Sequence, residues 1–343
     1  MRFPVTIIAA SVVIFLLFLV DLGTGSVAIP VSGVFSVLTG KEVEVESWKT
    51  IILIFRMPKA LTAVIAGAGL AVSGLMMQTL FRNPLAGPSV LGISSGASLG
   101  VALIVLGSGL GRQSTGLLRG LGTFGNFSLV TAATLGALLV LIIILLAARR
   151  VPNIMTLLII GLLCGFAFNA VVSVLIHFSR PEMIQAYVVW SFGSFGNVTR
   201  EELVVFLPIV LVTTFFACTY GKGLNVLLLG ETYARSMGMN FVAVRYGVIV
   251  VTAILAGSVT AYCGPVGFIG IAVPHLARIL LGSSDHRVLL PGTALLGTGV
   301  ALCADIMAQL PGVSTVLPLN SVTALIGSPV IIWFLLQRRK FEI

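Results

Sequence analysis

Long apolar runs without charge dominate this sequence, and they restrict the chain to a membrane-embedded helical fold. A helix needs about 20 mostly apolar residues to cross the hydrocarbon core of a bilayer. Only 9% of the residues are charged, against roughly 25% in soluble domains. Uncharged runs of crossing length occupy residues 3–20, 60–81, 89–111, 121–148, 151–179 and 203–221.

Two further runs, 246–277 and 306–337, are too long for one crossing, and each contains an internal break. The first is interrupted by Gly264-Pro265 and the second by Pro311-Gly312. Proline lacks a backbone N–H donor and ends a helix, so the chain can turn at each break.

These breaks divide the second half of the chain into four more spans, at 246–262, about 266–281, 288–310 and from about 320 onward. The predicted fold class is therefore an all-α polytopic membrane protein with ten transmembrane helices. No composition shift or long linker divides the chain, so residues 1–343 are expected to form a single transmembrane domain.

The basic residues indicate how the spans are oriented. An even number of spans puts both chain ends on one side, and the C-terminus carries Arg338, Arg339 and Lys340. Lys and Arg favour the cytoplasmic side, so both termini are predicted to be cytoplasmic. Twelve of the 20 basic and three of the 11 acidic residues then lie inside, which places the whole net charge of +9 on the inner face. The basic composition thus reflects membrane orientation and does not indicate nucleic-acid binding.

Residues 3–20 also resemble a signal peptide, because a basic residue precedes a short apolar run. We expect this span to be retained, since its removal would leave nine spans and place the basic C-terminus outside.

No motif for catalysis or nucleotide binding is present. The phosphate-binding pattern G-x-x-x-x-G-K-[ST] and the zinc pattern H-E-x-x-H are both absent from the sequence. Its four cysteines lie singly in different spans, which favours neither a metal site nor a disulfide framework. We therefore expect no catalytic site, no metal and no cofactor, and the chain is not expected to be an enzyme.

Asp305 is the acidic residue that lies clearly within an apolar stretch, near the outer end of its span. Intramembrane carboxylates often mark ion or proton pathways, which leaves an ion-coupled secondary transporter as an alternative. One carboxylate supports that alternative weakly, and a hydrogen-bonding role in helix packing is the favoured interpretation.

Residues 222–245 form the longest inner connection of the chain. Glu231 and Arg235 stand four residues apart in the order that favours a helical ion pair, and Gly230 and Gly238 flank them. This pattern predicts a short helix at the cytoplasmic surface, where a soluble partner could bind. The spacing alone is equally compatible with an ordinary solvated loop.

Three blocks of sequence carry a family resemblance. They are RMPKALTAVIAGAGLAVSGLMMQTLFRNPLAGPSVLGISSGASLG from Arg56, LLLGETYARSMGMN from Leu227, and GPVGFIGIAVPHLARILLGSSDHRVLLP from Gly264, the last followed by LCADIMAQ and LPLNSVTALIGSPVIIWFLL. They spread over nearly the whole chain in family order. On these blocks the chain resembles the FecCD/BtuC-type permeases of binding-protein-dependent ABC importers.

The resemblance implies a type II importer architecture, with two identical ten-helix subunits and a pathway along the dimer axis. Two copies of a separate ATPase would bind on the cytoplasmic side, and a substrate-binding protein would dock outside. The family carries bulky iron chelates, heme or vitamin B12 across the cytoplasmic membrane. An iron complex in the inner membrane of a Gram-negative cell is the favoured expectation, with vitamin B12 as the alternative.

The resemblance also assigns site residues, and because of it we call residues 222–245 the coupling segment. The family's coupling-helix pattern GE-x-x-A-x-x-x-G matches Gly230, Glu231, Ala234 and Gly238, and Arg235 joins them as the partner of Glu231.

The family's basic docking pair for the binding protein matches Arg56 and Lys59. The second position is usually Arg, and Lys keeps the charge but loses the planar two-point contact. A further basic docking position of some relatives is Gln309 here, which puts that contact in doubt. The inner gate would use Asn83 and Leu85 and, by a looser match, Met155 and Thr156.

Overall fold

The computed structural model describes residues 2–107, 123–151, 153–309 and 315–338, and within these ranges it contains helices and no β-strand. The predicted all-α class is confirmed. The element η1 is a π-helix and η2 is a 3-10 helix. In chain order the elements are α1 (Arg2–Gly23), α2 (Val31–Leu38), α3 (Ser47–Thr50), η1 (Ile51–Arg56), α4 (Met57–Phe81), η2 (Pro88–Leu91), α5 (Ile93–Val105), α7 (Thr123–Arg150), α8 (Ile154–His177), α9 (Pro181–Ser191), α10 (Arg200–Thr219), α11 (Gly221–Leu228), α12 (Glu231–Ser236), α13 (Phe241–Cys263), α14 (Ile269–Leu281), α15 (His286–Ala308) and α16 (Leu319–Arg338).

Six helices in the described ranges are long and apolar enough to cross a membrane. Four shorter apolar helices, Ile7–Gly23, Ile93–Val105, Ile269–Leu281 and Leu319–Trp333, occupy the positions of the other four predicted spans. Every predicted span therefore coincides with a helix, and the count of ten complete crossings stays a prediction.

The predicted turn at Gly264-Pro265 is present, because α13 ends at Cys263 and α14 begins at Ile269. The other predicted break, Pro311-Gly312, lies outside the described residues, between α15 and α16.

The second span begins earlier than its sequence boundary at residue 60. The elements α3, η1 and α4 form one continuous helix over Ser47–Phe81, because the apolar run Ile51–Phe55 continues the hydrophobic surface outward. This extension places Arg56 at the junction of a π-helix with an α-helix, an irregularity that is frequent at functional sites.

Helix α4 is the central helix of the bundle. In its most apolar stretch 83% of the residues are buried, and it packs against α10, α13, α14 and α15. Small residues permit this close packing. A Cβ on Gly67 of α4 would overlap the Gly297 carbonyl of α15, and a Cβ on Gly297 would overlap the Gly67 carbonyl. The same arrangement joins Gly96 of α5 to Gly136 of α7.

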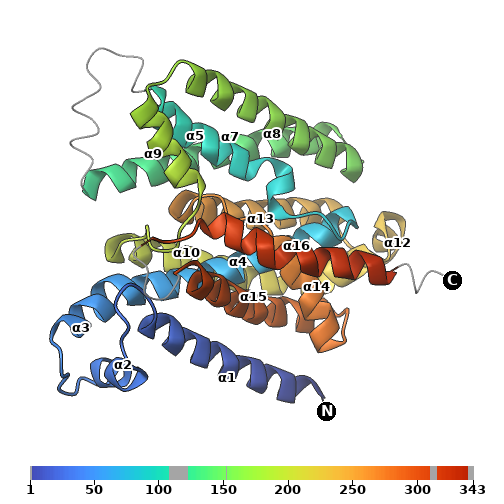
Figure 1. The fold of residues 1–343 in the computed structure, drawn as a ribbon. Coiled ribbons are helices and arrows are strands. Elements are labelled where there is room, and N and C mark those ends of the chain that lie inside the picture. Colours follow the sequence, from blue (N-terminus) through green and yellow to red (C-terminus); the bar gives the residue numbers. More distant parts are fainter. Residues whose placement is uncertain (1, 108–122, 152, 310–314, 339–343) are drawn as a thin grey trace.

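The two ends of the bundle carry different elements. The start of α1, the end of α16 and the helix α12 lie at one end, while α2, α3 and α9 lie at the other (Figure 1). We call the first the inner end and the second the outer end. This arrangement agrees with two termini on the same side of the membrane, and it places the coupling segment on that side as well.

Candidate functional site

The coupling segment contains two short helices, α11 and α12, before α13 begins. Helix α12 lies between Gly230, with φ +104°, and Gly238, with φ +76°. Positive φ values of this kind are readily adopted by glycine and disfavoured for other residues, so the two glycines end the helix on either side. The structure thus contains the short helix that the sequence predicts.

Helix α12 has one buried and one exposed face. Ala234 is fully buried, whereas Tyr233 and Met237 are each 58% exposed. The predicted ion pair is present, with Arg235 Nη2 2.7 Å from Glu231 Oε1. Since both partners are largely exposed, the pair contributes little to stability, and the exposed face is available for contact with another protein.

The first predicted gate segment is the loop that follows α4. The Asn83 side chain accepts a hydrogen bond from the Leu85 backbone N–H at 2.9 Å, which is an Asx turn. His275 Nε2 of α14 is hydrogen-bonded to the Pro84 carbonyl at 2.8 Å. These bonds fix the loop at the inner end, and Leu85 remains 43% exposed.

The second predicted gate segment is the first turn of α8. Met155 and Thr156 are both exposed there, and the Asn153 side chain caps the helix by accepting from the Met155 N–H at 2.8 Å. The element η2, which follows the Asn83 loop, packs against α8. This contact is made at Gly161, so the chain that follows the first gate segment packs against the helix that begins with the second.

At the outer end, Arg56 is more buried than a docking residue is expected to be. It is only 7% exposed, and its guanidinium donates to the carbonyls of Leu22, at 2.8 Å, and of Val27. Arg56 thus binds the end of α1 and the chain that follows it.

Lys59 lies in a polar cluster that joins α1, α4 and α15. Its ammonium is 2.8 Å from Asp305 and 3.7 Å from Asp21. The Gln309 side-chain amide donates to Asp21 at 2.9 Å and to Asp305 at 2.8 Å. We call Asp21, Lys59, Asp305 and Gln309 the outer polar cluster. Asp305 therefore has the helix-packing contacts that its sequence position predicts.

An outer cavity of about 980 Å³ lies beside this cluster. Its wall is formed by residues 25–27, by the helix from Ile51 to Lys59, by the loop 194–199 with the start of α10, and by the end of α15. Arg200 and Glu201 on this wall are exposed. The predicted docking pair thus faces a shared cavity, together with a third cation that the sequence did not single out.

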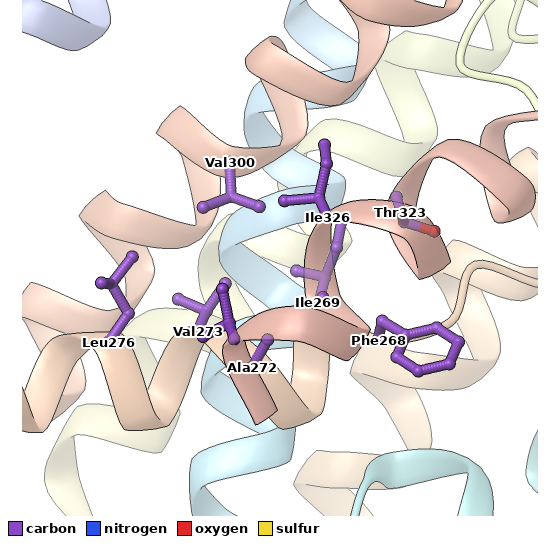
Figure 2. A pocket seen from close by; sticks show the side chains of 10 residues that line it. Phe268, Ile269, Ala272, Val273, Leu276, Val300, Thr323 and Ile326 are labelled. Carbon is purple, nitrogen blue, oxygen red and sulfur yellow. The ribbon is translucent and has the colours of Figure 1, made fainter. Parts of the chain in front are cut away.

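A second cavity, of about 60 Å³, lies between α14, α15 and α16 (Figure 2). Its wall is apolar, and Ile269, Val273 and Ile326 point into it. The hydroxyl of Thr323, which also lines the cavity, already donates a hydrogen bond to the Asn320 carbonyl. Apolar cavities of this kind stay dry, and pockets for drug-sized ligands measure about 300–1,000 Å³. This cavity is therefore a packing gap and not a cargo site.

Sequence reasoning did not assign roles to three residues that shape these ends. Asp21 directly follows the apolar run 3–20, and an acid at that place is a signal that could have been paired with Lys59. Arg82 and Arg245 are among the basic residues counted on the inner face, and each donates to a backbone carbonyl, a contact that leaves no trace in the sequence pattern.

The comparisons with known proteins agree with this architecture. Residues 13–337 match the model of the FecCD transport family. The vitamin B12 import system permease protein BtuC of Escherichia coli O9:H4 (strain HS) is 38% identical over 285 residues, covering 83% of each chain. The protein of the same name from Citrobacter koseri is 38% identical over 285 residues, covering 83% of this chain and 82% of that protein.

Solved structures have the same fold. An inward-facing conformation of an ABC transporter assigned to the metal-chelate type superposes with a TM-score of 0.84 at 28% identity, covering 97% of this chain and 99% of the other. PsaBC from Streptococcus pneumoniae, in complex with Fab, has a TM-score of 0.50 at 18% identity over 81% of this chain and 90% of the other, and supports the fold alone. With a family match over nearly the whole chain, a bundle of membrane helices and a short inner helix between two glycines, this protein belongs to the FecCD transport family.

Proposed function

We propose that this chain is the transmembrane permease subunit of an ABC importer that moves an iron complex, a ferric siderophore or heme, across the cytoplasmic membrane. Helix α12 carries the proposal, because it offers an exposed face at the inner end and is bounded by two glycines. The sequence has no phosphate-binding loop, so the energy of ATP has to enter through contact with a separate subunit. ATP hydrolysis belongs to two copies of that ATPase, and the permease is not itself an enzyme.

The exposed surface of α8 supports a homodimer with a central pathway. In its most apolar stretch only 17% of the residues are buried within one chain, although the mean hydropathy is 2.5. In the proposed dimer this helix lines the pathway of alternating access in both copies. An apolar wall binds cargo weakly, so selectivity rests with the binding protein. The exposed apolar side chains are Ile159, Leu162, Leu163, Phe166, Val171 and Val174.

The outer cavity is the proposed docking site of the substrate-binding protein. Arg56 and Lys59 lie on its wall and Arg200 is exposed beside them. Carboxylates on the binding protein would meet these cations. Because Lys59 is already paired with Asp305, its charge is partly offset and Arg200 is the more open cation.

Vitamin B12 is the second candidate cargo, and the relatives named as vitamin B12 import permeases favour it at 38% identity. An identity of this size is compatible with a shared permease mechanism and a different cargo, because the binding protein selects the cargo. Ferric siderophores, heme and cobalamin are all bulky metal chelates, which the apolar surface of α8 would pass without specific contacts.

Uptake by a deletion strain tests the cargo. Labelled cobalamin, heme and a ferric siderophore are compared with the parent strain and with a strain that carries the gene on a plasmid. Loss of uptake of one iron compound, restored by the plasmid, supports the proposal. Loss of cobalamin uptake alone assigns the second candidate, and unchanged uptake of all three contradicts both.

An ion-coupled transporter is the rival mechanism. Such transporters place their coupling sites near the middle of the membrane, whereas Asp21 and Asp305 lie near the outer helix ends and are paired with Lys59. Uptake that continues without ATP and stops with an uncoupler would favour the rival.

A further inference from the structure

Arg82 connects the first gate segment to the coupling segment. It directly precedes the Asn83 loop, and its guanidinium donates to the carbonyl of Leu228, the last residue of α11, at 2.7 Å. The same guanidinium packs against Gly230, since a Cβ there would lie 3.4 Å from both of its terminal nitrogens. The Arg82 side chain thus joins the end of α4 directly to the residues that precede α12.

The backbone at Arg82 is unusual. It has φ +49° and ψ +35°, the left-handed conformation at a helix end, where glycine is the usual residue. A non-glycine residue there is uncommon. The conformation turns the chain into the Asn83 loop while the side chain reaches the coupling segment, and glycine would supply the turn without the connection.

Arg245 connects the other end of the coupling segment to the second gate segment. It lies in the first turns of α13, is only 5% exposed, and donates to the carbonyl of Val151 at 2.9 Å. Val151 directly follows α7 and stands a few residues before Met155 and Thr156. Each of these guanidinium–carbonyl bonds thus joins the coupling segment to the chain that precedes one gate segment.

We propose that Arg82 and Arg245 are positioning residues that transmit movement of the coupling segment to the two gate segments. The inference rests on the proposed function. When the ATPase pair moves α12, the bond to Leu228 moves the Asn83 loop and the bond to Val151 moves the start of α8, so the two halves of the gate change together. In this proposal each arginine acts through its bond to a backbone carbonyl.

The simpler interpretation is that both arginines cap helix ends. Leu228 ends α11 and Val151 follows α7, and carbonyls at helix ends lack partners within the helix. A capping role predicts a loss of thermal stability with normal coupling. A transmission role predicts normal thermal stability with impaired coupling. Cargo transport then falls while ATP hydrolysis continues.

The experiment uses the complete transporter, with its ATPase and binding protein, in proteoliposomes. The probe is whichever of a ferric siderophore, heme or cyanocobalamin the wild-type protein takes up with ATP, and the readout is cargo moved per ATP hydrolysed. Arg82→Gly is the main variant, because glycine suits the left-handed backbone and only the side-chain connection is lost. Arg245→Gln tests the second connection, and Arg150→Gln is the control because Arg150 is an exposed inner arginine.

We expect Arg82→Gly and Arg245→Gln each to lower cargo per ATP at least tenfold, with ATP hydrolysis within twofold of wild type, while Arg150→Gln couples normally. Cargo per ATP within twofold of wild type in both variants overturns the inference. ATP-driven uptake that is absent from the wild-type transporter itself would instead overturn the proposed function, so the two failures are distinguishable.

A spin-label measurement keeps the test valid if a variant transports poorly for lack of folding. The four free cysteines are replaced by serine, and a label at Leu85→Cys reports the distance across the dimer with and without a non-hydrolysable ATP analogue. The inference predicts a distance change with Arg82 that is lost with Arg82→Gly, in protein that still elutes as an intact complex. If the distance changes equally with Arg82 and with Arg82→Gly, the result contradicts the inference.

Discussion

The ammonium of Lys59 lies 2.8 Å from a carboxylate oxygen of Asp305, and both side chains are largely buried at the outer end of the bundle. This pair joins α4 to α15, and the Asp21 carboxylate, which is fully buried, brings α1 into the same cluster. Because buried charges are costly without a partner, the contact has a structural role in addition to any role in docking. It also accounts for the presence of an acid in an otherwise apolar span.

We predict that Lys59→Met destabilises the protein more than Asp305→Asn does. The lysine variant leaves the Asp21 and Asp305 carboxylates together without their cation, which costs about 3–5 kcal/mol by analogy with other broken buried pairs. The asparagine variant leaves Lys59 one carboxylate, that of Asp21 at 3.7 Å, and is expected to cost about half as much. Thermal unfolding in detergent measures the difference.

The matched control is Lys49→Met, which removes the exposed pair with Glu46 and should change stability by about 0–1 kcal/mol. Equal losses for Lys59→Met and Asp305→Asn would show that the cluster does not act as a shared set of charges.

Docking of the binding protein should depend on Arg200. We expect Arg200→Glu to weaken the affinity for the binding protein roughly tenfold at low salt, mainly through slower association, because exposed interfacial charges steer encounter. The loss should shrink at high salt, where the Debye length is about 3 Å at 1 M. Binding of the purified binding protein to the transporter in nanodiscs, at two salt concentrations, measures this.

Lys41→Glu is the control for that experiment, because Lys41 is also exposed but does not line the outer cavity. If it weakens binding as much as Arg200→Glu, the effect is a general loss of positive charge and the docking assignment at the cavity is wrong.

Asn225 should hold α11 against α15. Its side-chain oxygen lies 2.8 Å from both the backbone nitrogen and Nδ1 of His286, a buried residue whose Nε2 is 2.7 Å from the Thr79 hydroxyl. Asn225→Ala leaves these buried groups without that partner, at a cost of about 1–3 kcal/mol. Thermal unfolding should show this loss, whereas Lys222→Ala, an exposed change on the same helix, should be nearly neutral.

The same asparagine influences an exposed acid in the inner loop. The Arg287 backbone N–H and the Asn225 amide both donate to Asp285 and hold its pKa below the ordinary value. A lowered pKa contributes stability above the ordinary pKa of the carboxyl, which is lost as the pH falls through the pKa of the folded state. The difference in stability between wild type and Asn225→Ala should therefore narrow in acid, and a constant difference across pH would contradict this contribution.

The sequence predicted helices better than contacts. Each predicted span coincides with a helix, and the short helix expected between Gly230 and Gly238 is present as α12. The uncharged run puts the start of the second span at residue 60, directly after the cations Arg56 and Lys59. The structure starts the helix at Ser47, because a helix continues through isolated cations near its outer end.

Contacts between distant residues could not be predicted in this way. The family resemblance assigns Arg56 to docking of the binding protein, and the structure buries it against backbone carbonyls at the end of α1 and in the chain that follows. Arg82 and Arg245 each donate to a backbone carbonyl, and a backbone contact of this kind leaves no mark in the sequence pattern. Only the packing of α1, α7 and α11 against other helices brings those carbonyls within reach.

Glu231→Arg should uncouple ATP hydrolysis from transport without preventing membrane insertion. The residue begins α12 next to Gly230, and its carboxylate is 2.7 Å from Arg235. Arginine there reverses the charge at the helix start, where an acid is favourable, and places two like charges one turn apart. Like charges at this spacing cost about 0.2–0.5 kcal/mol, too little to unfold the protein. The membrane fraction should therefore contain a normal amount of the variant, while uptake falls at least tenfold.

Glu231→Gln separates loss of the ion pair from charge repulsion, because it removes the ion pair without creating repulsion and should keep most of the uptake. Normal uptake by Glu231→Arg at normal expression would show that α12 does not couple the permease to its ATPase.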